Sequence, residues 1–216
     1  SEMAGNDMFG TIFHAVMQHL YAPYKGREVS AAELSSLAEN EDFLKKQIRS
    51  TYRKEMFHDE TSDSSAPMSG IDNLTLSVLL EYTKRMLRFD RQQTPFEYFD
   101  AEYNASKNIT LSNGEKVRLA GKIDRIDFRN SCTRVIDYKT GSGSTQYSSL
   151  ERLFSDKCDN HYALQTLFYC LLLDGDRCFA NLSPHIYFLR DVSETTDFNT
   201  AVRSKEGIFN FEKDGE

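Results

Sequence analysis

Apolar residues near the start of the chain recur at the spacing of an α-helix. Between Met8 and Tyr24, the apolar positions that share one helical face are Phe9, Ile12, Phe13, Val16 and Leu20. This periodicity predicts an amphipathic helix, and Asp7 is placed to cap its start. His14 falls off the apolar face, beside other polar side chains. From spacing alone, His14 is an ordinary polar position of the helix.

The segment Lys25–Gln93 has a helical pattern over most of its length. Ser30 and Glu33 have the spacing of a capping box, which predicts a helix start at this point. A second helix is predicted to follow it, and a third, long helix spans Asp72–Arg91. Before the long helix, Thr61–Gly70 is rich in serine, proline and glycine, so we expect a loop there.

After the long helix, the pattern changes from helical to alternating. Phe96–Ala105 is predicted to be a strand, and it contains Glu102. Two short predicted strands, Ile109–Leu111 and Val117–Leu119, flank the dipeptide Asn113-Gly114. Because Asn-Gly is typical of two-residue type I′ turns, these segments predict an antiparallel sheet. Most glutamates on strands point away from functional sites, so Glu102 is not counted among the candidate ligands.

The next hairpin is the centre of the predicted sheet. Its strands are Lys116–Phe128 and Arg134–Thr140, joined by a short turn at Asn130–Ser131. Side chains in a strand alternate between its two faces, so Asp137 and Lys139 project together. The hairpin ends at Gly141 with a link of small residues.

Folding this hairpin about its turn brings Asp124 near Asp137 and Lys139. Two close carboxylates repel each other unless a cation lies between them, and hard oxygen ligands suit Mg²⁺ or Mn²⁺. A lysine beside such an ion can stabilise anionic charge or help to activate a water molecule. The alternative for an isolated Asp-x-Lys is a solvated surface ion pair. The combination with Asp124 favours a metal site.

The remaining chain predicts one more helix and one more strand. Tyr162–Leu173 is apolar nearly all round, which is typical of a buried helix. Gln165 and Tyr169 are the exceptions and, four positions apart, share one face. His185–Arg190 predicts a last buried strand, and the sequence after it is polar. Together these elements predict an α/β fold.

Two stretches of the central hairpin, GKIDRID and VIDYKTG, resemble the motifs of the PD-(D/E)XK nuclease superfamily. Within this superfamily, they are most similar to the RecB/AddB-like exonuclease domains. The resemblance implies a restriction-endonuclease-like core, in which a central mixed sheet is flanked by helices. We expect one nuclease domain over residues 1–216, with 25–93 as a helical insertion, cut from a longer helicase–nuclease chain.

The resemblance assigns roles to residues of the two motifs. Asp124 and Asp137 are implied to be both catalytic and metal-binding, with Mg²⁺ or Mn²⁺ as the cofactor. Lys139 is implied to be catalytic, and the backbone carbonyl of Tyr138 to be a further metal ligand. The family chemistry leaves a 5′-phosphate and a 3′-hydroxyl.

Two further signatures of the RecB/AddB-like domains match this chain. Gly10 and His14 fit a G-x-x-x-H signature, which implies that His14 helps to bind the metal. Gln165 and Tyr169 fit a Q-x-x-x-Y signature, which implies contacts with the catalytic lysine and with DNA. Without the resemblance, this pair is equally well read as an ordinary hydrogen-bonded pair at the edge of the core.

The implied function is a metal-dependent DNA nuclease, an exonuclease of DNA repair and recombination, working with a helicase domain or subunit. One alternative is a catalytically silent nuclease-like domain that only binds DNA or acts as a scaffold. Another is a hydrolase of small phosphoesters, although a wide sheet face and the Gln165–Tyr169 pair favour a polymer. The retained Asp124, Asp137 and Lys139 favour an active enzyme.

Composition and charge refine this interpretation. The 216 residues are 39% hydrophobic, enough for a core, and no apolar run approaches the ~20 residues of a membrane helix. There is no signal-peptide pattern. Four cysteines lack C-x-x-C spacing, which predicts reduced thiols in a cytoplasmic protein. Their positions also depart from the iron–sulfur ligands of many AddB-like domains.

The net charge of −7 argues against a domain that binds DNA tightly by itself, because phosphate contacts supply much of DNA affinity. We expect DNA to be delivered by a neighbouring domain or subunit. Basic residues do line the outer face of the predicted long helix: Lys84, Arg85, Arg88 and Arg91. Both a solvated face and a contact with DNA phosphates account for them.

Overall fold

The computed structural model describes residues 2–57, 68–192, 199–205 and 207–208. Contacts divide the chain into two compact units. The first comprises Ser1–Phe96, Lys139–Ser142 and Phe188–Phe198. The second comprises Glu97–Tyr138, Gly143–Tyr187 and Asn199–Glu216. The single nuclease domain over residues 1–216 stays a prediction.

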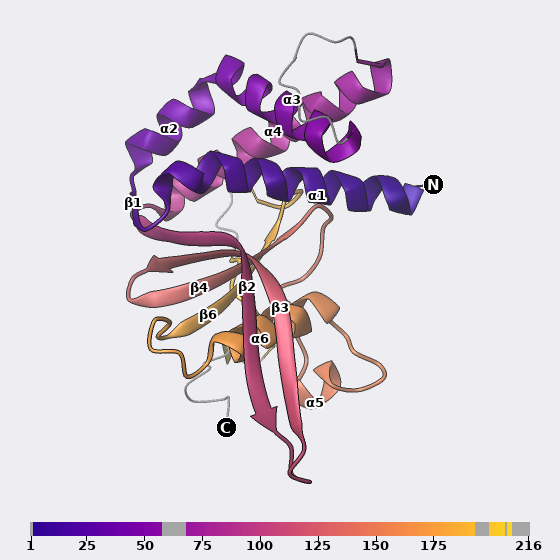
Figure 1. Cartoon of the computed structure of the whole chain (residues 1–216), viewed down its shortest axis with the longest axis vertical. Coiled ribbons are helices and arrows are strands. Elements are labelled where there is room, and N and C mark those ends of the chain that lie inside the picture. Colours follow the sequence, from indigo (N-terminus) through magenta and orange to yellow (C-terminus); the bar gives the residue numbers. More distant parts are fainter. Residues whose placement is uncertain (1, 58–67, 193–198, 206, 209–216) are drawn as a thin grey trace. The chain divides into compact units, whose positions relative to one another are not determined.

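Helices dominate the first unit (Figure 1). Its elements are α1 (Glu2–Tyr21), the 3₁₀-helix η1 (Ala22–Tyr24), β1 (Arg27–Val29), α2 (Ala31–Glu39), α3 (Glu41–Phe57) and α4 (Gly70–Gln93). The amphipathic first helix is confirmed, because Ile12, Phe13, Val16 and Leu20 are all buried. Its last predicted turn is instead η1, which holds Pro23 in its first turn.

Two capping boxes start helices of this unit. At α2, Glu33 N donates to Ser30 Oγ and Ser30 N donates to Glu33 Oε2, which confirms the predicted box. At α4, Ser69 and Asp72 make the same reciprocal pair. The sequence prediction missed this second box because aspartate replaces the usual glutamate or glutamine. Most of the predicted loop 61–70 lies outside the described residues, and Gly70 already belongs to α4.

The basic face of α4 is partly used inside the first unit. Lys84 Nζ forms an ion pair with Glu41 at 2.8 Å. The Arg85 guanidinium lies 5.5 Å from the centre of the Tyr82 ring and donates to the carbonyl of Leu189. Packing within the unit therefore accounts for Lys84 and Arg85.

The main sheet of the second unit places four strands in the order β2-β3-β4-β6. These are β2 (Phe96–Thr110), β3 (Lys116–Arg129), β4 (Cys132–Lys139) and β6 (Leu182–Phe188). β2, β3 and β4 are antiparallel, and the predicted turn at Asn130–Ser131 is confirmed, with both residues at positive φ. β6 runs in the direction of β4, because hydrogen bonds link Thr133 to Ala180 and Lys139 to Leu189. The predicted α/β class with a mixed sheet is confirmed.

The first hairpin differs from its prediction. The predicted two-residue type I′ turn at Asn113-Gly114 is wrong, because Leu111 N donates to Glu115 O at 2.8 Å and leaves the three residues 112–114 between them as the loop. Asn113 accepts a hydrogen bond from Glu115 N through its side chain, and Gly114 alone in the loop has positive φ. The predicted strands Phe96–Ala105 and Ile109–Leu111 are parts of one strand, β2, and β3 is likewise unbroken. β2 and β3 therefore form a long hairpin (Figure 1).

Helix α6 (His161–Leu173) packs against β3, and α5 (Leu150–Leu153) packs against α6. A small second sheet consists of β5 (Gln146–Tyr147), β7 (Arg203–Ser204) and β8 (Gly207–Ile208). The core between α6 and the main sheet includes Ala105, Ile123, Val135, Cys170, Leu172 and Phe179. All four cysteines are free thiols, as predicted. Among the described residues, no helix is both long and apolar enough to cross a membrane.

Gly121 allows the close approach of α6 to β3. A Cβ added at this position would lie 3.0 Å from Leu172 Cδ1 and 3.0 Å from Tyr169 Cε1. We expect Gly121→Ala to lower the free energy of unfolding by about 1–2 kcal/mol, because the helix must shift to relieve the overlap. Urea denaturation measures the effect. Gly70→Ala is the matched control, since a Cβ there meets no atom within 4 Å; equal stability of the two variants would contradict the prediction.

Candidate active site

Two carboxylates face each other across the long hairpin. The register pairs Ala101 with Arg125 and Tyr103 with Ile123, so Glu102 lies opposite Asp124. A carboxylate oxygen of Glu102 and one of Asp124 approach within 4.8 Å. Such a pair is stable when a cation shares it, and oxygen donors suit Mg²⁺ or Mn²⁺. The donors present therefore fit a divalent ion.

Glu102 has an unusual backbone conformation at this point. Its φ is 52°, in the left-handed region that costs a non-glycine residue about 1 kcal/mol or more. Its carboxylate also forms an ion pair with Lys122 on β3. The sequence prediction left Glu102 out because a strand pattern carries no information about such a local change of backbone. The positive φ is the signal that marks this residue.

Asp124 also reaches the neighbouring strand β4. The last pair of the β3–β4 ladder is Arg125 with Ile136, and beyond it Asp124 Oδ2 accepts a hydrogen bond from Tyr138 N at 2.8 Å. Asp137, next to Tyr138, is buried. The prediction that the hairpin turn brings Asp124 toward the D-Y-K segment is therefore confirmed. The roles of Asp137 and of the Tyr138 carbonyl as metal ligands stay predictions.

Helix α6 supplies two polar side chains to this part of the second unit. Gln165 Nε2 donates to Tyr169 Oη at 2.8 Å. Burial raises the pKa of Tyr169 to about 12; the hydrogen bond from Gln165 opposes this, and the charges of Asp124, Asp137 and Glu102 add to it. The tyrosine is thus neutral at neutral pH and lies within electrostatic range of all three carboxylates. It can donate a hydrogen bond to an anionic ligand.

The first unit contains the other two predicted site residues, His14 and Lys139. Lys139 is the last residue of β4, and its carbonyl accepts a hydrogen bond from Leu189 N at 2.8 Å. His14 is half-buried on α1, four positions after Gly10. A Cβ added at Gly10 would lie 3.8 Å from Thr140 Cγ2, so α1 lies against the residues that follow the D-Y-K motif. The roles of His14 and Lys139 stay predictions.

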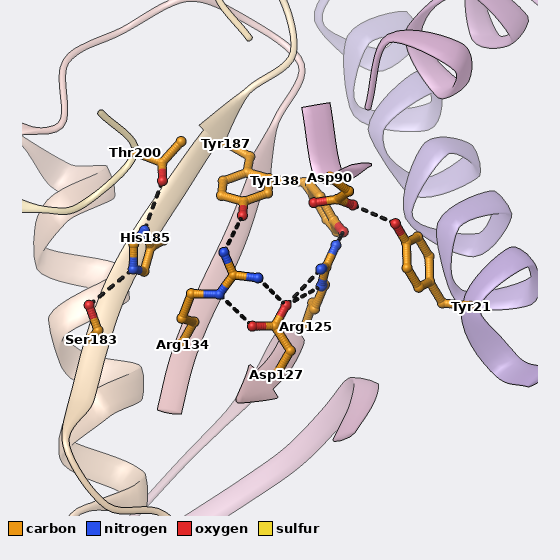
Figure 2. Close-up of polar contacts among 10 residues, drawn as sticks. All are labelled: Tyr21, Asp90, Arg125, Asp127, Arg134, Tyr138, Ser183, His185, Tyr187 and Thr200. Atoms are coloured by element: carbon orange, nitrogen blue, oxygen red, sulfur yellow. Dashed lines mark hydrogen bonds and ion pairs between the residues drawn. The ribbon is translucent and has the colours of Figure 1, made fainter. Parts of the chain in front are cut away.

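A buried cluster of charges lies inside the second unit (Figure 2). Asp127 accepts hydrogen bonds from Arg125 Nε at 2.8 Å and from Arg134 Nε at 2.5 Å. Arg125, Asp127 and Arg134 are respectively 1%, 0% and 4% exposed. Burial alone would raise the pKa of the Asp127 carboxyl, but the charges of Arg134 and Arg125 and their hydrogen bonds hold it below its ordinary value.

The charged cluster is joined to the D-Y-K motif through tyrosine. Arg125 Nη1 lies 3.1 Å from Tyr138 Oη, and Arg134 Nη1 lies 3.2 Å from Tyr187 Oη (Figure 2). The cluster therefore holds the side chain of Tyr138, the residue between Asp137 and Lys139. The sequence prediction missed the cluster because Arg134, which binds Asp127, lies on the next strand.

A histidine held by two hydroxyls lies on and beside β6. His185 Nε2 lies 3.0 Å from Ser183 Oγ, and Nδ1 lies 2.8 Å from Thr200 Oγ1 (Figure 2). Burial and the nearby charge of Arg134 lower the pKa of His185 to about 3. Because a general base works best with a pKa near the working pH, this Ser–His pair is unsuited to nucleophilic catalysis. It serves to join β6 to residue 200.

A family model described as the PD-(D/E)XK nuclease superfamily matches residues 1–212, nearly the whole chain. No curated protein matches this sequence.

Proposed function

This chain belongs to the PD-(D/E)XK nuclease superfamily, and we propose that it is a Mg²⁺- or Mn²⁺-dependent DNA exonuclease of the RecB/AddB-like branch. Its α/β fold is the restriction-endonuclease-like fold of the superfamily. The observation that carries the proposal is the convergence of Glu102 and Asp124 beside the D-Y-K strand. A nuclease of this superfamily acts on nucleic acid. That the nucleic acid is DNA, and that cleavage starts from an end, are parts of our proposal.

We assign the metal to Asp124, Asp137, His14 and the carbonyl of Tyr138, with Glu102 as an additional carboxylate. When bound, the ion would act as a Lewis acid: it would lower the pKa of a water molecule and stabilise the charge of the pentavalent phosphate. The carboxylates hold the ion, and the hydrogen bond from Tyr138 N keeps Asp124 in place.

The remaining polar residues act on the substrate. The ammonium of Lys139 neutralises charge that develops on the phosphate, which is the role that needs a fixed cation. The neutral hydroxyl of Tyr169, oriented by Gln165, donates to a phosphate oxygen. Attack by water leaves a 5′-phosphate and a 3′-hydroxyl. We place this reaction in DNA repair and recombination, beside a helicase that delivers DNA to an acidic protein with net charge −7.

End-labelled single- and double-stranded DNA tests the proposal. We expect cleavage with Mg²⁺ or Mn²⁺, release of mononucleotides from an end, and no cleavage in EDTA. Asp124→Asn is the control for contaminating nucleases, because it removes a charge from the carboxylate pair and should abolish the activity. Cleavage that persists in EDTA, or in Asp124→Asn, would place the chemistry elsewhere.

A DNA-binding scaffold without turnover is the second candidate function. It is favoured if the protein binds DNA and no metal ion induces cleavage. The same preparations decide between the two functions, because binding is measured in EDTA and cleavage in the presence of metal.

A further inference from the structure

The long β2–β3 hairpin has two different faces. From residue 104 to residue 122, the even-numbered strand positions are exposed: Asn104, Ser106, Asn108, Thr110, Lys116, Arg118, Ala120 and Lys122. The odd-numbered positions pack toward α6, where Ala105 and Leu119 join the core and Gly121 meets Leu172. On that side, Lys107 Nζ binds the carboxylate and the carbonyl of Asp174. We call the exposed even-numbered set the hairpin face.

Every charged side chain of the hairpin face is basic, and the structure describes all of residues 104–122. The cations are Lys116, Arg118 and Lys122, in a chain whose net charge is −7. The other members are small or hydrogen-bonding, and Arg118 Nη2 donates to Ser106 Oγ at 3.3 Å. The face therefore combines positive charge with hydroxyl and amide groups, which are the side chains that contact phosphate and sugar in DNA complexes.

The hairpin face begins at the carboxylate pair. Lys122 forms an ion pair with Glu102, the residue opposite Asp124. A strand rises ~3.4 Å per residue, so Arg118 lies ~20 Å and Lys116 ~27 Å along β3 from Asp124. Duplex DNA of that length has roughly six to eight base pairs. A polymer held at the carboxylates thus has a basic surface leading away from them.

We propose that the hairpin face binds the phosphate backbone of DNA and guides the polymer to the carboxylate pair. The proposal rests on the proposed nuclease function for its direction, but binding by the face needs no turnover. The positive charges of Lys116 and Arg118 on one side of the hairpin favour a ligand of opposite charge, whereas Lys107 on the other side is bound by Asp174.

The test is DNA binding in EDTA, measured by fluorescence anisotropy over a range of salt. The variant Lys116→Gln/Arg118→Gln leaves Lys122, and with it the Glu102 ion pair, intact. Lys107→Gln is the matched control, because it removes one charge from the other side of the same hairpin. Probes are a labelled duplex of about 20 base pairs and a single strand of equal length, both longer than the basic surface.

For the double variant, we expect the slope of log affinity against log salt to fall by about 0.7–0.9 per removed charge, the lower figure applying to single strands. Affinity should fall for any sequence, and the Lys107→Gln slope should equal that of the wild type. Thermal unfolding of both variants should match the wild type, since they change surface side chains. An unchanged slope in the double variant, an equal loss in Lys107→Gln, or no binding by the wild type at low salt would overturn the proposal.

A second readout separates this proposal from the nuclease function. Hydrolysis of bis(4-nitrophenyl) phosphate, which is too small to reach Arg118, should be the same in the double variant and the wild type. DNA bound through the hairpin face without cleavage in any metal would refute the nuclease alone. DNA cleavage with wild-type salt dependence in the double variant would refute the hairpin face alone.

Discussion

Replacing Lys139 by alanine is expected to reduce DNA cleavage about 10²–10³-fold or more while metal binding is retained. A protonated lysine has three donors and no lone pair, so it cannot be a ligand of the metal ion. Its proposed contribution is a fixed positive charge at the phosphate in the transition state. That contribution is lost entirely when the side chain ends at Cβ.

Single-turnover cleavage of labelled DNA measures the rate, and the rise in melting temperature with Mg²⁺ or Mn²⁺ measures metal binding. Asp137→Ala is the contrasting variant, because it should lose both cleavage and the metal-induced rise. Lys107→Ala removes the same kind of charge far along the chain from the motif and should cleave as the wild type does. Wild-type cleavage by Lys139→Ala would show that the lysine has no part in the chemistry.

Local rules predicted the elements that local interactions decide. The helix face of Ile12 and Val16, the capping box of Ser30 and the turn at Asn130–Ser131 each depend on residues within a few positions of one another. The turn at Asn130–Ser131 also sets the register of β3 and β4. In that register Asp124 accepts a hydrogen bond from Tyr138 N. One correctly predicted turn was therefore enough to bring Asp124 to the D-Y-K segment.

The errors came from interactions that a local pattern does not contain. Asn113 binds its own loop through its side chain, so the Asn-Gly dipeptide made a longer loop instead of a type I′ turn. Glu102 lies opposite Asp124 because of the β2–β3 register, and its φ of 52° is a local change of backbone that the strand pattern does not contain. Arg125 and Asp127 alternate with apolar residues as a solvated face would, and only the presence of Arg134 on the next strand makes their burial stable.

Asp127→Asn is expected to lower the free energy of unfolding by about 3–5 kcal/mol, because it leaves two buried guanidinium groups without a counter-charge. Asparagine has nearly the same shape, so loss of packing contributes little. Urea denaturation measures the change. Asp156→Asn is the matched control, since Asp156 is exposed and its substitution should alter stability by no more than about 0.5 kcal/mol.

The dependence of this effect on pH follows from the lowered pKa of Asp127. A carboxyl whose folded-state pKa lies below its unfolded value of ~3.9 contributes its stability above that value and loses it as pH falls through the folded pKa. The difference in free energy of unfolding between wild type and Asp127→Asn should therefore be constant near neutral pH and shrink in acid, where Asp127 takes up a proton.

A double-mutant cycle with Arg134→Met gives a second check. The double variant should lose less free energy of unfolding than the sum of the two single losses, because Arg134→Met removes one of the cations that Asp127→Asn leaves uncompensated. A difference that stays the same from neutral to acid pH, or additive losses, would contradict the proposal that the charge of Asp127 stabilises the cluster.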